Sequence, residues 1–173
     1  MKTLNEHLAQ YAAYHRDPRN IATHFVGIPM IFLAIIVLLS RPVLVSLSTV
    51  PLTPALVLSC MVAIYYVWLD LRYGLVMAGV FVMCLLLANE LAAQSTTLWL
   101  SMGIGLFVVG WIIQFIGHYY EGKKPAFVDD LMGLLIGPLF ILVEFGFALR
   151  LRKEVQLAIE AQVGKVRIRE KSH

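Results

Sequence analysis

Charge and cysteine are scarce in this sequence, and each scarcity excludes a class of protein. Charged residues make up only 14% of the 173 positions, whereas hydrophobic residues make up 60%. A soluble domain has about 25% charged residues, so an ordinary soluble protein is excluded. The 2 cysteines, Cys60 and Cys84, both fall in apolar runs. Buried cysteine behaves as a small hydrophobe, which argues against a disulfide framework and against a thiolate metal site.

Targeting and nucleic-acid signals are also missing. The first 20 residues are polar, so we expect no cleavable signal peptide. The net charge of +3 comes from basic residues beside apolar runs, as membrane topology requires, and no basic patch with aromatic residues accompanies them. We therefore expect no nucleic acid partner. The length and the lack of internal repeats favour one domain.

Long apolar runs dominate what remains. They occupy about residues 21–40, 55–69, 73–89 and 97–117, and runs of this kind are typical of membrane spans. Some are short and would cross only where the bilayer thins locally or where their polar ends lie near its surface. Residues 43–54, with Pro51 and Pro54, are predicted to form a loop. The predicted fold is all-α, a polytopic membrane helical bundle with four full spans.

Amphipathic helices are predicted at both ends of the chain. Near the N-terminus, one helix over residues 3–16 would carry apolar side chains and one histidine on a single face, namely Leu4, Leu8, Tyr11 and His15. Pro18 would end it, and Asn20 would cap the next helix. After Arg150, Leu151, Val155, Ile159 and Val163 recur every four residues, which predicts a surface helix on the membrane or against a partner. We thus divide the chain into a membrane-embedded domain, 1–150, and a basic amphipathic tail, 151–173.

The distribution of Lys and Arg predicts the topology. With four crossings and a cytoplasmic N-terminus, every one of the 14 basic residues except Arg41 lies on the cytoplasmic side. Residues 131–149 are apolar but are interrupted by Gly133, Gly137, Pro138 and Glu144. A fifth full span here would move the basic tail outside, so a re-entrant or interfacial helical segment is favoured. Both termini are then cytoplasmic in a multi-pass integral membrane protein.

This topology brings three histidines to one side of the membrane. His15 and His24 lie at the cytoplasmic end of the first span, and His118 lies at the cytoplasmic end of the fourth. Ionisable groups beside an apolar bundle usually face its interior, and neutral imidazole is the commonest metal ligand. Three imidazoles with open coordination positions suit iron(II), zinc or another borderline cation. A hydrogen-bonded polar network is the alternative that the spacing leaves open. His7, on an exposed helix, is interpreted as an interface residue, and His173 as terminal.

Four polar side chains accompany these histidines. Gln114 lies one helical turn before His118, and Asn20 lies one turn before His24, so each pair shares a helical face. Glu121 follows on the same side, as does Glu144 if residues 131–149 turn back. The two carboxylates could bind the metal or hold an imidazole N–H. Alternatively they could form structural ion pairs with the nearby cations Arg16, Arg19 or Lys124.

Two stretches of sequence resemble the signatures of a known family. Residues 14–20 read YHRDPRN and 24–29 read HFVGIP, while residues 114–126 read QFIGHYYEGKKPA. Leu139-Phe140 with Glu144 resembles the end of the same conserved region. Together they are similar to the small polytopic membrane proteins related to the fungal 2-hydroxy fatty acid dioxygenase, formerly a domain of unknown function. The resemblance covers roughly residues 5–150.

The resemblance implies an iron(II)-dependent oxidoreductase that uses O2 to shorten 2-hydroxy long-chain fatty acids by one carbon, in fatty acid α-oxidation. It implies Fe(2+) as cofactor, O2 as co-substrate and membrane lipids as surroundings. His15, His24 and His118 become the catalytic and metal-binding candidates. Supporting roles fall to the polar residues that match the motifs, namely Asn20, Gln114, Glu121 and Glu144. The active site would be cytoplasmic, in a bacterial inner membrane or, in a eukaryote, the endoplasmic reticulum.

Two other functions stay open at this point. A zinc hydrolase acting on lipid amides or esters could use the same histidines with an activated water. A small transporter or scaffold would need polar residues in the middle of the spans, where the later spans offer little besides Ser59, Ser101 and Gln114. Di-iron hydroxylases are disfavoured, because enzymes that resemble that class carry about eight clustered histidines with HxxxH and HxxHH spacings. This chain has 5 histidines and neither spacing.

Overall fold

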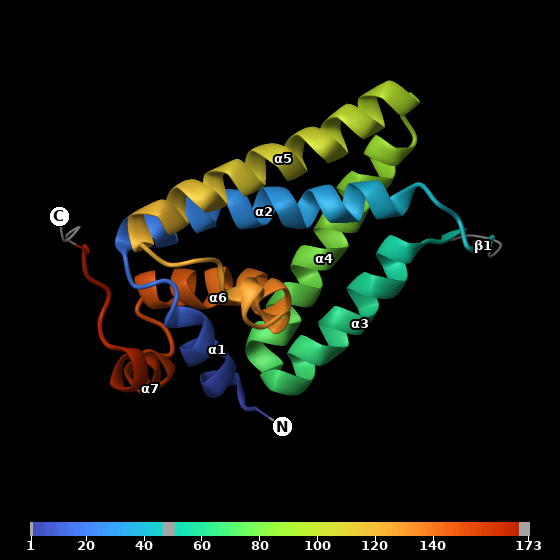
Figure 1. Ribbon diagram of the computed structural model, residues 1–173. Coiled ribbons are helices and arrows are strands. Elements are labelled where there is room, and N and C mark those ends of the chain that lie inside the picture. The colour runs from blue at the N-terminus through green and yellow to red at the C-terminus, as the bar shows by residue number, and fades with distance from the viewer. Residues whose placement is uncertain (1, 47–50, 170–173) are drawn as a thin grey trace. The chain divides into compact units, whose positions relative to one another are not determined.

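The computed structural model describes residues 2–46 and 51–169, and these residues are almost entirely helical (Figure 1). The all-α prediction is confirmed. The helices are α1 (Leu4–Ala12), α2 (Pro18–Ser40), α3 (Pro54–Leu69), α4 (Leu71–Ala92), α5 (Thr96–Glu121), the short 3-10 helix η1 (Ala126–Val128), α6 (Met132–Ala148) and α7 (Lys153–Val163). Two short antiparallel strands, β1 (Val45–Ser46) and β2 (Pro51–Leu52), pair within the segment predicted as a loop.

Within residues 2–46 and 51–169, three helices are long and apolar enough to cross a membrane, namely α2, α4 and α5. The helix α3 is apolar but has only 16 residues, which at 1.5 Å per residue is about 24 Å and less than a hydrocarbon core of about 30 Å. The helices α6 and α7 are bent by 114° at their break, as in a broken span or a re-entrant segment. The four predicted apolar runs are therefore all helical, and three of them meet the length of a full span.

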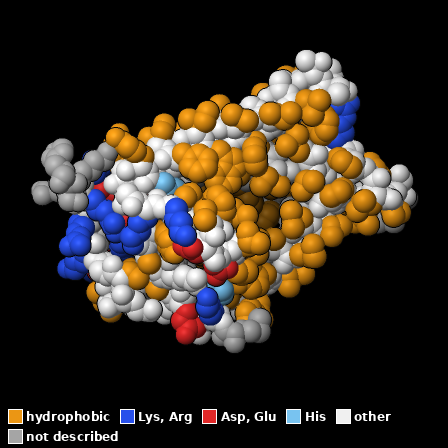
Figure 2. Space-filling view, in the orientation of Figure 1, with side chains coloured by type: hydrophobic (Ala, Val, Ile, Leu, Met, Phe, Trp, Pro, Cys, Tyr) orange, Lys and Arg blue, Asp and Glu red, His pale blue; other side chains and the backbone are white. Residues whose placement is uncertain are grey.

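The chain divides into two compact units. Residues Pro29–Gly110 form the middle unit, in which α3 and α4 are joined at Asp70. Asp70 ends α3 and caps α4, because its Oδ1 accepts the backbone N–H of Tyr73 at 3.0 Å. Large apolar side chains such as Met83 and Leu86 are exposed on this unit, and its face in Figure 2 is mostly hydrophobic. A surface of this kind is suited to lipid rather than to water.

The terminal unit comprises Met1–Ile28 and Trp111–His173 and includes the first part of α2 and the last part of α5. In it α1 packs against α6 and α7. Leu8, Phe140 and Ile159 are buried in this core. Charged side chains gather on one area of the same unit (Figure 2). The predicted tail helix therefore exists as α7, and it buries Val155 and Ile159 rather than exposing them.

The first helix is shorter than predicted, and α2 starts earlier. Helix α1 ends at Ala12, so His15 lies in a loop and not on the apolar helix face. Pro18 is the first residue of α2, where its missing N–H costs nothing. Asp17 precedes it, and its Oδ1 accepts the N–H of Arg19 at 2.9 Å. Asn20 is therefore inside α2, and the prediction that it caps the helix is wrong.

Candidate metal centre

His15, His24 and His118 form one buried cluster in the terminal unit. One ring nitrogen from each lies within 4.8 Å of the others. The loop after α1 supplies His15, the second turn of α2 supplies His24, and the last turn of α5 supplies His118. The exposed fractions are only 0%, 1% and 7%, so the cluster is closed to bulk solvent. Residues far apart in the sequence thus place three potential ligands around one point.

Backbone carbonyls fix the orientation of two of these rings. The Nδ1 atom of His15 lies 2.7 Å from the Tyr11 carbonyl, and the Nδ1 atom of His24 lies 2.8 Å from the Asn20 carbonyl. A carbonyl only accepts, so each Nδ1 carries the proton and each Nε2 presents a lone pair. The same arrangement orients metal-bound histidines in general.

The two free lone pairs face each other. His15 Nε2 lies 3.0 Å from His24 Nε2. With both protons on Nδ1, no hydrogen bond joins these atoms, and a bound cation would offset their mutual repulsion. Two imidazole nitrogens bound at about 2.1 Å to one metal ion, with a right angle between the bonds, would also lie about 3 Å apart. The donor set therefore fits a bound cation.

The surroundings of His15 keep its imidazole neutral. Burial lowers the pKa of His15 well below the ordinary histidine value, and the neighbouring His24 lowers it further. The Tyr11 ring stacks on His15 with centroids 4.2 Å apart, and Phe140 lies 5.6 Å from the His15 centroid. Neutral imidazole is the form that binds metals.

Glu121 fastens the loop that carries His15. Its side chain is fully buried, and its Oε2 accepts the backbone N–H groups of Arg16 and Asp17 at 2.9 and 2.7 Å. The same oxygen accepts a hydrogen bond from Nδ2 of Asn20 at 3.2 Å. Nδ2 of Asn20 also donates to the Tyr14 carbonyl at 3.1 Å. Glu121 lies outside the three-residue ligand group that the described residues form. Glu121 and Asn20 thus act on the loop and the start of α2.

Glu144 forms the structural ion pair that was one of its two predicted roles. Its Oε1 lies 3.5 Å from Nη2 of Arg16. Arg16 is itself buried, and its Nε donates to the carbonyls of Ala12 and His15 at 3.0 and 2.9 Å. The Arg16 side chain therefore links Glu144 of α6 to the end of α1 and to the backbone of His15.

Two polar atoms near the cluster lack hydrogen-bond partners among the described residues. They are Nε2 of Gln114 and Oδ1 of Asn20, and both are buried. Gln114 shares a face of α5 with His118, as the sequence predicted. Buried polar groups are nearly always satisfied, so unpartnered atoms beside a candidate site indicate room for a bound group.

Gly117 permits the approach of α5 to α2, and the sequence analysis missed this role. A Cβ at Gly117 would overlap the Thr23 hydroxyl and would come within 2.5 Å of the Asn20 Oδ1. It would also lie 3.3 Å from the Asn20 Cα. The sequence signal was the place of this glycine directly before His118, whereas its contact with α2 is seen only in the structure.

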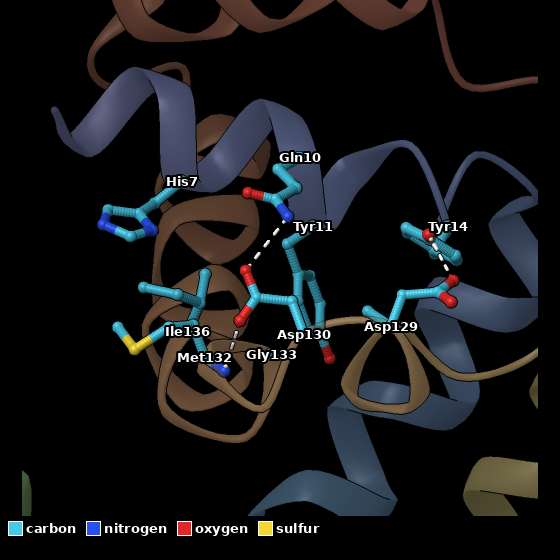
Figure 3. A pocket seen from close by; sticks show the side chains of 10 residues that line it. His7, Gln10, Tyr11, Tyr14, Asp129, Asp130, Met132, Gly133 and Ile136 are labelled. Carbon is cyan, nitrogen blue, oxygen red and sulfur yellow. Dashed lines mark hydrogen bonds between the residues drawn. The ribbon is translucent and has the colours of Figure 1, made fainter. Parts of the chain in front are cut away.

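A small pocket lies between α1 and the segment around α6 (Figure 3), and it is lined in part by Tyr11, whose ring stacks on His15. Gln10 and Tyr14 cross it to Asp130 and Asp129 through hydrogen bonds of 3.1 and 2.7 Å. His7 lines this pocket and is only 9% exposed, so the prediction of an exposed interface residue is wrong. His7 is buried because α1 packs against α6. His7 is not among the three clustered histidines.

Fold and site together define a small all-α protein, with helices apolar enough for a membrane and a buried cluster of three histidines. The chain belongs to the 2-hydroxy-palmitic acid dioxygenase Mpo1-like family, whose model matches residues 1–149. It is 35% identical, over 159 residues, to the 2-hydroxy-palmitic acid dioxygenase MPO1 of Saccharomyces cerevisiae (strain ATCC 204508 / S288c). That alignment covers 91% of this chain and 87% of the yeast protein. The comparison with solved structures gives no significant match.

The family indicated by the two sequence signatures is thereby confirmed. The metal, the ligand roles of the histidines and the topology stay predictions.

Proposed function

We propose that this protein is an iron(II)-dependent dioxygenase that shortens 2-hydroxy fatty acids by one carbon, as in fatty acid α-oxidation. The observation that carries the proposal is the buried group of His15, His24 and His118, whose ligand atoms lie within 4.8 Å of one another. The name of the yeast relative, a 2-hydroxy-palmitic acid dioxygenase, supports the substrate class. With one O2 per substrate, atom balance requires the shorter acid, carbon dioxide and water as products.

The three imidazoles would hold the metal, and this chain's other residues would keep them in place. Iron(II) with open coordination positions supplies oxygen activation when bound by such ligands. The carbonyls of Tyr11 and Asn20 keep the protons of His15 and His24 on Nδ1, which leaves Nε2 free. Burial of the cluster excludes bulk water, which protects reactive chemistry from side reactions.

Gln114 is the residue that we assign to substrate recognition. Its Nε2 is buried, unpartnered and on the same helix face as His118. It would donate a hydrogen bond to the carboxylate or the 2-hydroxyl of the fatty acid. Ile112, Phe115 and Ile116 lie on the same part of α5 with exposed side chains, and they would contact the alkyl chain in the bilayer. The amphipathic substrate would thus meet polar and apolar groups on one helix.

We further propose that residues 1–150 form one membrane-embedded catalytic domain, with both termini and the histidine cluster on the cytoplasmic side. The support is the positive-inside rule, because Arg41 alone among the basic residues would lie outside. In a bacterium the enzyme would then lie in the inner membrane, and in a eukaryote it would lie in the endoplasmic reticulum.

The direct test is substitution of the clustered histidines. We expect His15→Ala, His24→Ala and His118→Ala each to lose bound iron after anaerobic purification, and to stop converting 2-hydroxypalmitate to the acid one carbon shorter. His7→Gln is the matched control, since His7 lies outside the cluster, and it should retain both properties. Full turnover by His24→Ala and His118→Ala would rule out the site. Bound zinc with oxygen-independent turnover would instead indicate a lipid hydrolase.

A further inference from the structure

The chain beyond the family match returns to the histidine loop. Gly164 ends α7 with φ of +81°, and the following residues, up to Arg169, carry no regular secondary structure. We call residues 164–169 the strap. Its backbone meets the loop after α1, because the N–H of Arg167 donates to the carbonyl of Arg16 at 2.9 Å. The N–H of Arg169 donates to Oδ2 of Asp17, also at 2.9 Å.

The loop and the start of α2 hold the strap in return. Nη1 of Arg16 donates to the Gly164 carbonyl at 3.2 Å, and Nη2 of Arg19 donates to the Arg169 carbonyl at 3.1 Å. The strap therefore donates two hydrogen bonds to the loop and accepts two from Arg16 and Arg19, and these contacts extend from Gly164 to Arg169. A helix that merely lay on the membrane surface would need none of them.

The side chain of Arg169 reaches the buried carboxylate that organises this loop. Its Nε lies 3.0 Å from Oε1 of Glu121, and Glu121 is fully buried. The second oxygen of Glu121 already accepts the N–H groups of Arg16 and Asp17. The side chain of Arg16 is paired with Glu144 instead. Arg169 is partly exposed, but removing it would leave the fully buried Glu121 carboxylate without the cation that faces it, which is unfavourable.

We propose that Arg169 is a positioning residue for the metal site, acting through Glu121 on the backbone next to His15. The inference rests on the proposed function in so far as His15 binds a metal. Without Arg169, Oε1 of the buried Glu121 carboxylate would lose the cation that faces it, and the hydrogen bonds of Glu121 to the Arg16 and Asp17 amides would weaken. His15 would then sample other positions, and the three nitrogens would bind a cation less tightly.

Two alanine variants of equal charge test the proposal in the full-length protein. Arg169→Ala removes the ion pair with Glu121 and keeps the backbone N–H to Asp17. Arg167→Ala is the control, because its side chain is exposed and its backbone bond to Arg16 is retained. We expect about tenfold weaker iron(II) binding for Arg169→Ala, measured by competition with a chelator, since partners of metal ligands affect affinity by about 10–100-fold. Arg167→Ala should match the unaltered protein.

A second readout needs no metal. In the metal-free protein, the peptide covering residues 14–20 should exchange its amide hydrogens faster in Arg169→Ala than in Arg167→Ala. Arg169→Lys restores the positive charge, and we expect it to regain most of the protection. Unchanged exchange and unchanged affinity in Arg169→Ala, or a lysine variant no better than alanine, would overturn the proposal.

The two readouts separate this inference from the proposed function. If the unaltered protein binds no iron, the proposed function fails, and the exchange measurement still decides whether Arg169 organises the loop. If the unaltered protein binds iron and Arg169→Ala binds it equally well with normal exchange, only the role of Arg169 is lost.

Discussion

At the scale of single residues, the facing nitrogens of His15 and His24 support the proposed binding of a cation. Their Nε2 atoms lie 3.0 Å apart while both Nδ1 atoms are engaged with carbonyls. Without a cation, one ring must rotate, change its tautomer or take up a proton against the effect of burial. The polar network that the spacing had left open as an alternative would need a proton between these two atoms.

Metal removal should therefore lower the stability of the protein. A ligand that binds only the folded state stabilises it by about 2.7 kcal/mol at a hundredfold excess over its Kd. We expect the thermal unfolding midpoint in detergent to fall when a chelator removes iron and to recover when iron(II) is returned anaerobically. In His24→Ala the midpoint should not respond to either step. If the unfolding midpoint of the unaltered protein changed neither on removal of iron nor on its return, metal binding would be contradicted.

Gln114 provides a prediction about substrate binding. Gln114→Leu keeps the size of the side chain and removes the unpartnered Nε2 donor. A hydrogen bond to a charged group contributes about 1.5–3 kcal/mol, so we expect KM for 2-hydroxypalmitate to rise about tenfold or more. Iron content should not change, because Gln114 is not a ligand in this scheme. A variant that lost iron while keeping KM would reassign Gln114 to the metal.

At the scale of helices, the apolar pattern predicted the elements well and their ends poorly. All four long apolar runs became helices, because a segment without charge in a bilayer must satisfy its backbone internally. The start of α2 was misplaced, since Asn20 looked like a cap while Asp17 and Pro18 form the first turn. The competing signals were local and equally plausible, and tertiary contacts of Asn20 with Glu121 decided between them.

The site shows the same limit. His15, His24 and His118 could be chosen from motif and predicted topology, because charge asymmetry predicts that these helix ends share one side of the membrane. The partners of Glu121 could not, because they are backbone N–H groups in a loop and an arginine beyond the residues that the family model matches. Periodicity carries no information about contacts of this kind.

The crossing of α2 and α5 supplies the prediction at this scale. Gly117→Ala should push α5 away from α2, because the added methyl group would meet the Thr23 hydroxyl, Asn20 Oδ1 and the Asn20 backbone. Overpacking of this kind costs about 1–3 kcal/mol. We expect reduced iron content, since His24 and His118 sit on the two separated helices. Gly105→Ala on the same helix is the control, as its new Cβ meets nothing within 4 Å.

At the scale of the whole molecule, charge asymmetry and apolar surface together make the membrane the natural environment. The middle unit exposes large hydrophobic side chains, whereas the charged side chains gather on the terminal unit. The bent pair of α6 and α7 fits this pattern, because α7 carries Glu154 and Glu160 and packs on α1 of its own unit. A segment that turns back keeps the basic residues after α6 on the same side as the N-terminus.

Labelling of introduced cysteines tests that topology. In a chain with Cys60→Ala and Cys84→Ala, we place one cysteine by Ser46→Cys and, separately, another by Lys165→Cys, at two exposed positions. In intact cells whose outer layers let the reagent reach the inner membrane, a membrane-impermeant maleimide should label the cysteine at position 46. It should label the cysteine at position 165 only after lysis. If α6 and α7 made a complete further crossing, the cysteine at position 165 would react in intact cells. That outcome would place the strap on the side opposite His15, although the strap contacts the His15 loop in the structure. Retained iron binding in the same labelled cells would then force a topology in which the N-terminus is also outside.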